Sequence, residues 1–352
     1  MSLDTPWICP PCRGRLVPGP SRWECRGCGR AFDDWRGIPD LRTRQDGYLD
    51  NDRDRAYAAV LLADFDRLDF PAFLARYFEL SPELPDDLKR RQIEHLRTAP
   101  GRTRRWIAAM READPPWLDL GCGSGSFLEV AGRTIPGMMG VDIALRWLLV
   151  ARKRLDEAGL PELPLACACA EDLPIADAAL GGVVAGDVIE HVSDQAATLA
   201  EAHRTLREGG RLFLASPNRF SLAPEPHVQV WGVGYLPRRW MAPYVRWRRN
   251  VDFRAIRTLG YAEWRRLLRQ SPFRGGEVMV PPLPPDDLDG FGFLKRGIAK
   301  THNGFVGARP GQWVGRRIGP LFHVHCQKSV ARTPNGTSPA TRRRSTPSIE
   351  PG

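Results

Sequence analysis

The stretch Trp117-Leu118-Asp119-Leu120-Gly121-Cys122-Gly123-Ser124-Gly125 decides the fold of this chain. It predicts a short apolar strand that runs into a glycine-rich turn, followed by a helix that begins near Phe127. Glycines let the backbone turn tightly and approach a ligand without an intervening Cβ atom. The N–H groups at the start of the next helix can bind an anion. The run differs from the Gly-x-Gly-x-x-Gly of dinucleotide folds, because it reads Gly-x-Gly-x-Gly with an acid two residues ahead.

Segments further along the chain extend this pattern. Asp142 closes a second predicted strand seventeen residues after Gly125. A carboxylate at this place can accept hydrogen bonds from both hydroxyls of a ribose; alternatively, Asp142 caps the helix predicted over 144–155. A loop then follows at 170–175, a strand and turn at 182–192, and a helix end, Gly-Gly turn and strand at 206–215.

In this order, from about 106 to 218, the segments resemble the class I S-adenosylmethionine (SAM) methyltransferases, and the run 119–125 resembles their motif I. The resemblance implies a Rossmann-like α/β fold with a seven-stranded sheet, whose last two strands are expected at 276–281 and 321–327. It also implies SAM as the cofactor. Asp119, Gly121, Gly123 and Gly125 would surround its methionine end, Asp142 would take the ribose, and Glu171, Asp172 and Asp187 would complete the cofactor-binding residues.

Two departures from the family pattern matter. Cys169 stands where many members carry an acid near the adenine. We therefore expect Glu171, Asp172 or backbone groups to contact the adenine instead. The fourth strand begins with Gly181 and Gly182 rather than with an acid. Paired glycines inside a strand weaken it or mark a close approach of another segment.

The expected chemistry asks little of the protein. SAM carries its own leaving group, a sulfonium, so the protein has to hold a nucleophile in line with the methyl group and exclude water. Positioning of this kind supplies roughly 7–11 kcal/mol in favourable cases. A general base is needed only for a weak nucleophile such as a hydroxyl.

Composition bounds the other possibilities. The 352 residues have room for two domains, and their formal net charge of +10 suggests an anionic partner or an uneven charge distribution. Arginine supplies most of the positive charge, a bias typical of GC-rich genomes that weakens any nucleic-acid argument built on charge alone. The start of the chain lacks the features of a secretory signal, and no apolar run reaches the length of a membrane span. The sequence therefore predicts a cytoplasmic protein.

Four of the eight cysteines form two Cys-x-x-Cys pairs, Cys9 with Cys12 and Cys25 with Cys28. Two such knuckles suit four thiolates around a tetrahedral Zn²⁺. A closed four-thiolate site leaves no position for substrate, so the zinc is predicted to be structural. Two disulfides or a redox pair are the alternatives. The segment resembles zinc ribbons fused to bacterial methyltransferases and the small activator subunits of tRNA methyltransferases.

The chain thus divides by expectation into a zinc ribbon (1–42), a helical linker or cap (43–115), a methyltransferase domain (116–330) with a substrate insertion at about 217–260, and a disordered basic tail (331–352). Helical spacing covers 56–78, one or two helices cover 88–110, and an amphipathic helix covers 261–270. Pro-, Ser-, Thr- and Arg-rich composition marks the tail.

The insertion holds the candidate substrate residues. Ligands of open α/β sheets bind outside the carboxyl ends of the strands, where Asn218 and the loop after it should lie. Asn218 could contact substrate or cap a turn. His227 is the candidate general base, because an unperturbed pKa near 6.5 suits proton removal at neutral pH; alternatively it holds the loop by hydrogen bonds.

Ten arginines between 238 and 269 interleave with aromatic residues. This segment could bind RNA, rest on an anionic membrane surface, grip a phosphorylated lipid or sugar carrier, or form a solvated helix face. We expect a SAM-dependent methyltransferase that acts on oxygen in a small-molecule or lipid- or sugar-linked acceptor. The alternatives are an rRNA or tRNA methyltransferase and a non-catalytic SAM-fold protein whose ribbon recruits a partner.

Overall fold

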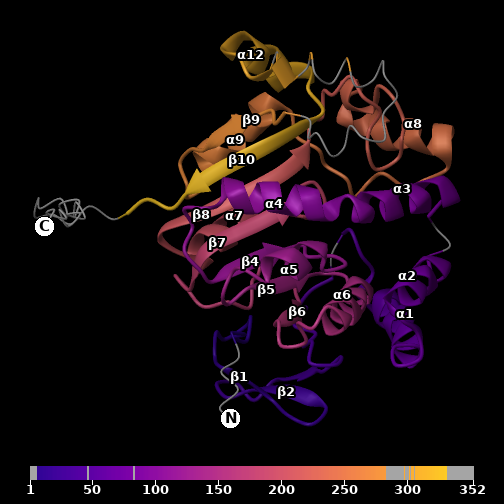
Figure 1. Ribbon diagram of the computed structural model, residues 1–352, viewed down its shortest axis with the longest axis vertical. Coiled ribbons are helices and arrows are strands. Elements are labelled where there is room, and N and C mark those ends of the chain that lie inside the picture. The colour runs from indigo at the N-terminus through magenta and orange to yellow at the C-terminus, as the bar shows by residue number, and fades with distance from the viewer. Residues whose placement is uncertain are drawn as a thin grey trace, which may run out of the picture.

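Figure 1 shows the computed structural model, an α/β core with a small ribbon at one end and a helical insertion at the other. The structure describes residues 6–45, 47–81, 84–282, 297, 301, 303–304 and 306–330. The tail predicted over 331–352 lies outside these residues. Within the described ranges, the helices are too short or too polar to cross a bilayer.

The core is a seven-stranded sheet in the order β6-β5-β4-β7-β8-β10-β9. Its strands are β4 (Trp117–Leu120), β5 (Met139–Asp142), β6 (Leu165–Cys167), β7 (Leu180–Gly186), β8 (Leu206–Pro217), β9 (Glu277–Met279) and β10 (Leu321–Gln327). β10 runs antiparallel to both of its neighbours, β8 and β9, and β4 to β8 pair in parallel. Order and directions are those of the class I SAM methyltransferase fold, so the predicted fold class is confirmed.

Side-chain alternation along the strands builds a core on each face of the sheet. In β7, Val183 and Ala185 belong to one buried cluster and Val184 to the other. In the same way Leu214 of β8 faces one cluster and Phe213 the other, as the period of two along a strand requires. Helices α5 (Ser126–Ala131) and α6 (Leu145–Glu157) cover one face, and α7 (Gln195–Thr205) and α9 (Tyr261–Gln270) the other.

Four helices precede the sheet: α1 (Asn51–Ala63), α2 (Phe70–Glu79), α3 (Asp86–Arg97) and α4 (Ala99–Ala109). The one or two helices predicted over 88–110 are α3 and α4, which meet at Thr98, and Pro100 lies in the first turn of α4, where its missing N–H costs nothing. Trp106 of α4 packs onto the end of β7, where a Cβ atom on Gly186 would lie 2.1 Å from its ring. Helices α1 and α2 pack on α6.

The amino-terminal ribbon, with strands β1 (Leu16–Pro18), β2 (Arg22–Cys25) and β3 (Ala31–Asp33), docks beside the β6 edge of the sheet. The backbone N–H of Leu41 donates to the carbonyl of Cys167 at 2.7 Å, and that of Cys167 donates to the carbonyl of Pro39 at 3.0 Å. Further along, Ile8 donates to Pro174 at 2.9 Å. The ribbon is therefore joined to the core by backbone hydrogen bonds.

The insertion after β8 contains a 3₁₀ turn at Val233–Tyr235 and helix α8 (Arg238–Arg249). It has a small core of its own, formed by Val228, Val230, Val233, Met241, Val245 and Phe253. After the segment that the structure leaves undescribed, α12 (Arg309–Ile318) leads into β10. Asn218 donates from Nδ2 to the carbonyl of Gly319 at 2.8 Å, which ties the start of the insertion to the end of α12.

Candidate functional site

Three glycines shape the turn between β4 and α5. Gly121, Gly123 and Gly125 all have positive φ, at 71°, 50° and 74°. A Cβ atom on Gly121 would lie 2.2 Å from Cγ2 of Val188, and one on Gly125 would lie 3.0 Å from Cβ of Ala151. A Cβ atom on Gly123 would meet open space. The first and third glycines are thus required by packing, and the second faces open space, so its predicted contact with the cofactor stays a prediction.

Asp142, at the end of β5, holds this turn in place. Its Oδ2 accepts a hydrogen bond from the N–H of Gly123 at 2.8 Å, and its Oδ1 accepts one from the N–H of Ala144 at 2.8 Å. Burial raises the pKa of Asp142 to about 6, although both N–H groups favour the carboxylate. The side chain therefore joins the glycine turn to the start of α6. The ribose contact stays a prediction, and each oxygen keeps a lone pair for it.

Asp119 lies one strand position before the turn and is fully buried. Its Oδ2 accepts no hydrogen bond from the described residues. Burial and the nearby charge of Asp142 hold the pKa of Asp119 well above its usual range. A buried acceptor without a partner is costly unless a ligand or water satisfies it. Together with the open face of Gly123, this orphaned oxygen fits a bound ligand with N–H groups, such as the amino group of SAM.

The other three predicted cofactor residues lie on loops that follow β6 and β7, at the carboxyl ends of the strands. Glu171 accepts from the N–H of Asp194 at 3.0 Å and lies 3.7 Å from Arg44. Asp172 lies 3.4 Å from Arg13 of the ribbon. Asp187 follows β7 with a φ of 57° and stands 3.9 Å from His95. The contacts of Glu171 and Asp172 attach the linker and the ribbon, so their contact with the adenine stays a prediction.

A cluster of titratable side chains lies beyond the ends of β7 and β8. Glu190 has no exposed surface and accepts from Ser216 Oγ at 3.0 Å. Its second oxygen, Oε1, has no hydrogen-bond partner among the described residues and lies 3.8 Å from Nε2 of His227. Burial and the charge of Asp187 raise the pKa of Glu190 to about 8.

His227 is held from its other side by Glu225. The two side chains meet at 2.6 Å through Nδ1 of His227, and Glu225 also accepts from the backbone N–H of His227 at 2.9 Å. Burial alone would lower the pKa of His227, but the hydrogen bond and charge of Glu225 outweigh it and raise the pKa to about 9. At neutral pH His227 is an imidazolium, so as a base it becomes available only at higher pH.

His191 completes the cluster. Its ring meets that of His227 edge-on at 4.8 Å, and Tyr48 from the linker packs against it at 4.8 Å. Burial and the charge of His227 lower the pKa of His191 to about 3, so this imidazole is neutral. The ligand atoms of Glu190, His191 and His227 lie within 4.8 Å of one another, so these three side chains could also hold a divalent cation.

Sequence reasoning found His227 but missed Glu190 and Glu225 as its partners. Glu225 could have been identified from the sequence as a partner of His227, because it lies only two residues before it. Glu190 could not have been identified in this way, because only the fold brings it next to His227, which lies 37 positions later in the sequence. Asn218 uses both ends of its amide on backbone groups, donating to Gly319 and accepting from Phe220 at 3.1 Å. Its predicted contact with substrate remains untested.

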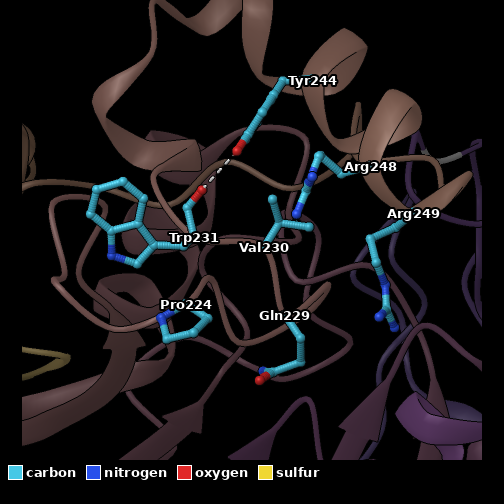
Figure 2. Close-up of a pocket in the computed structure, with 7 residues that line it drawn as sticks. All are labelled: Pro224, Gln229, Val230, Trp231, Tyr244, Arg248 and Arg249. Carbon is cyan, nitrogen blue, oxygen red and sulfur yellow. Dashed lines mark hydrogen bonds between the residues drawn. The ribbon is translucent and has the colours of Figure 1, made fainter.

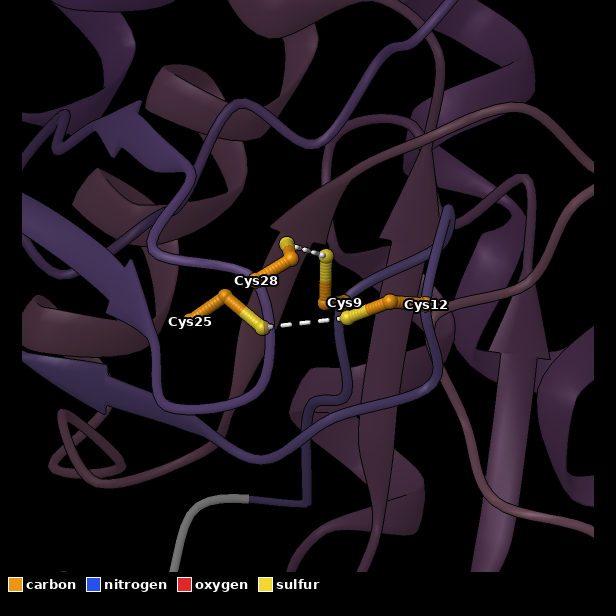
Figure 3. A group of neighbouring side chains, drawn as sticks. All are labelled: Cys9, Cys12, Cys25 and Cys28. Carbon is orange, nitrogen blue, oxygen red and sulfur yellow. Dashed lines mark hydrogen bonds between the residues drawn. The ribbon is translucent and has the colours of Figure 1, made fainter.

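The four cysteines of the ribbon gather into one group, shown in Figure 3. The sulfurs of Cys9 and Cys28 are 3.8 Å apart and those of Cys12 and Cys25 are 3.3 Å apart. All four are free thiols. Tetrahedral zinc with Zn–S bonds of about 2.3 Å separates its sulfurs by roughly 3.8 Å, so the donor set fits a Zn²⁺ ion. The N–H groups of Gly14 and Gly27 also point at Cys12 and Cys25.

Comparisons with known proteins agree with this geometry. Residues 118–214 match the family model described as a methyltransferase domain. Over 131 residues the chain is 32% identical to a ubiquinone biosynthesis O-methyltransferase of Parvibaculum lavamentivorans, covering 36% of this chain and 50% of that protein. It is 30% identical over 136 residues to a probable S-adenosylmethionine-dependent methyltransferase of Mycobacterium tuberculosis, covering 39% and 44%.

Among solved structures, geranyl diphosphate C-methyltransferase from Streptomyces coelicolor is 16% identical, with 65% of this chain and 75% of that chain covered and a TM-score of 0.42. A likeness at this level carries no argument about function. The chain spans about a third to a half of the length of the curated relatives it matches. The matched region contains the glycine turn, Asp142 and Glu190, and it ends before the insertion that carries His227.

Proposed function

We propose that this protein is a SAM-dependent methyltransferase with a structural zinc ribbon. The observation that carries the proposal is the buried Oδ2 of Asp119, which has no hydrogen-bond partner among the described residues, together with the open face of Gly123. The family match over 118–214 and the similarity to SAM-dependent methyltransferases support the same cofactor. When bound, SAM supplies an electrophilic methyl group on a sulfonium.

The residues would divide the work as follows. Asp119 and the glycine turn would bind the methionine end, and Asp142 would orient the turn and accept from the ribose hydroxyls. Gly121 packs against Val188, which belongs to the same loop as Glu190. The cofactor turn and the Glu190–His227 cluster are therefore neighbours, and the acceptor would lie between them. His227, oriented by Glu225, would take the proton of a hydroxyl acceptor once it is itself neutral.

The acceptor we propose is a small molecule or a lipid- or sugar-linked metabolite that is methylated on oxygen. Two features support it. The Glu190-His191-Val192 region resembles quinone-type methyltransferases, and the chain is 32% identical over 131 residues to a ubiquinone biosynthesis O-methyltransferase. A hydroxyl is a weak nucleophile, so its methylation calls for the base that the cluster offers.

The alternative function, an RNA methyltransferase, has less support. In such an enzyme, the ribbon and the arginine-rich segment would bind one RNA together. Figure 1 places the ribbon at one end of the long axis and α8 toward the other. The ribbon and α8 therefore lie toward different ends of the molecule.

The first experiment is a calorimetric titration of SAM into the purified protein, with zinc content measured on the same sample. Asp142→Ala should weaken SAM binding, because it releases Gly123 and the ribose. Gly123→Trp should abolish binding, because the new side chain fills the cofactor space. A folded, zinc-loaded wild type that does not bind SAM would overturn the proposal and favour the non-catalytic alternative.

A further inference from the structure

Exposed apolar side chains gather toward the end of the molecule opposite the ribbon, and we call this group the apolar patch. We define it by five side chains: Leu222, Trp231, Trp240, Trp247 and Ile318. They are 55%, 62%, 55%, 74% and 37% exposed. Trp240 and Trp247 are seven residues apart on α8, so both project from its outer face, whereas Met241 and Val245 face the small core of the insertion.

Hydrogen bonds join the members of the patch. The N–H of Leu222 donates to the carbonyl of Ile318 at 3.2 Å, and Nε1 of Trp231 donates to the carbonyl of Leu222 at 3.0 Å. Tyr244 of α8 donates from its hydroxyl to the carbonyl of Trp231 at 3.2 Å, and its ring lies 6.0 Å from that of Trp247. The loop at 222–231, the neighbouring helix α8 and the distant Ile318 thus contribute to one surface, and exposed apolar patches of this kind mark interaction sites.

Arginines border the patch. Helix α8 contains five arginines and no acidic residue. Arg238 pairs with Glu263 and Arg249 pairs with Asp87, but Arg239, Arg246 and Arg248 have no ion-pair partner within the described residues. Arg248 lies 5.4 Å from the ring of Trp247, so positive charge stands directly beside the apolar surface.

The groove next to the patch is small. Figure 2 shows that Trp231, Tyr244, Arg248 and Arg249 line it, and its volume is about 450 Å³. This volume lies within the roughly 300–1,000 Å³ that small-ligand pockets occupy. Leu222 and Ile318 are aliphatic and have no ring face on which a base could stack.

We propose that the apolar patch docks this protein onto the surface of an anionic lipid bilayer. Tryptophan is enriched at the membrane–water interface, and a helix with outward aromatic side chains and flanking arginines binds there without spanning the bilayer. The net charge of +10 also favours binding to an anionic bilayer. The occupant is thus a phospholipid surface with negative headgroups.

Docking of this kind would bring the candidate site to the membrane. His227 lies in the same loop as Leu222 and Trp231, between the two. This step rests on the proposed function: a patch at this place would let an acceptor dissolved in the bilayer reach the cluster around Glu190. Vesicle binding itself needs neither SAM nor the acceptor, so the two proposals fail separately.

The test is co-sedimentation of the full-length protein with vesicles of phosphatidylcholine containing 30% phosphatidylglycerol, beside vesicles of phosphatidylcholine alone. We expect binding to the anionic vesicles that weakens with added salt. Trp240→Ala/Trp247→Ala should lower the partition coefficient at least about tenfold, because the apolar area that enters the interface is lost. Arg246→Gln/Arg248→Gln should lower it roughly 25-fold, because each arginine at an anionic surface contributes about fivefold.

The matched control is Arg26→Gln/Arg30→Gln, which removes the same charge from exposed positions on the ribbon and should leave binding within about twofold. Circular dichroism establishes that each variant is folded. Equal losses in both arginine pairs would overturn the proposal, since the effect would then follow net charge alone. Absence of vesicle binding by the wild type would also overturn it, as would binding of single-stranded RNA in place of vesicles.

Discussion

At the scale of single residues, Asp142 links cofactor binding to pH. Its pKa of about 6 in the free protein means that the carboxylate is present at pH 7 and is lost on acidification. Only the carboxylate can accept from Gly123, Ala144 and two ribose hydroxyls together. We therefore expect the Kd for SAM to be constant above pH 7 and to rise about tenfold per pH unit below 6, as calorimetry can measure. Asp142→Asn should bind more weakly and lose this dependence; a wild-type Kd that stays flat to pH 5 would contradict the assignment.

Glu225 acts through His227, and its effect can be measured without knowing the acceptor. A rise in the pKa of His227 from 6.5 to about 9 corresponds to roughly 3 kcal/mol of folding stability. Because the folded-state pKa is raised, this contribution is complete below pH 6.5 and disappears as the pH rises through 9. Glu225→Gln should therefore lower the free energy of unfolding by up to about 3 kcal/mol at pH 6, and by little at pH 9.5, in urea denaturation.

A second readout separates positioning from simple support of the loop. If His227 is the base, the methylation rate of the wild type should rise with pH and level off above about 9. Glu225→Gln should move this midpoint toward the ordinary value of 6.5, and His227→Ala should flatten the profile. A profile that keeps its midpoint in Glu225→Gln would show that Glu225 does not set the pKa of His227.

At the scale of elements, the structure distinguishes two glycines of the turn that look equivalent in the sequence. Gly121 is closely packed, and Gly123 faces open space. Gly121→Ala places a methyl group 2.2 Å from Val188 at a φ of 71°, so it should destabilise the fold by several kcal/mol. Gly123→Ala meets open space and has only its positive φ to overcome, at about 1–2 kcal/mol. Urea denaturation measures the difference, and calorimetry should find SAM binding weakened in the more stable Gly123 variant. Equal destabilisation would contradict the packing described for the turn.

Strong sequence patterns located the regular elements well. The helix predicted over 261–270 is α9, and the strand predicted over 321–327 is β10, with the same bounds. Of the two alternatives given for Gly181 and Gly182, the structure shows the close approach, because a Cβ atom on Gly181 would lie 1.8 Å from the carbonyl oxygen of Asp114. Helix α8 was not located, since Pro243 interrupts its pattern and only Met241 and Val245 are buried. Its exposed tryptophans give it an apolar outer face, which periodicity alone would assign to the core.

At the scale of the whole molecule, the ribbon packs closely on the core, because Trp7, Leu16 and Phe32 belong to the same buried cluster as the strands of the sheet. Arg13 donates to the carbonyl of Leu173 at 3.1 Å and pairs with Asp172, and the segment 39–41 pairs with the β6 edge. Within the described residues, no hydrogen bond or ion pair joins the glycine turn or Asp142 to the four cysteines. Loss of zinc should therefore unfold the ribbon and leave the cofactor turn in place.

Cys9→Ser/Cys12→Ser tests this separation. The wild type should contain about one zinc per chain by elemental analysis, and the variant none, because two thiolates cannot hold a structural site. The variant should unfold at a lower temperature and be cleaved by protease within the ribbon, while SAM affinity falls by no more than about tenfold through loosening of the loop at Asp172. Loss of SAM binding as severe as in Asp142→Ala would show that the ribbon builds the cofactor site. A zinc-free wild type with unchanged stability would show that the cysteines serve another chemistry.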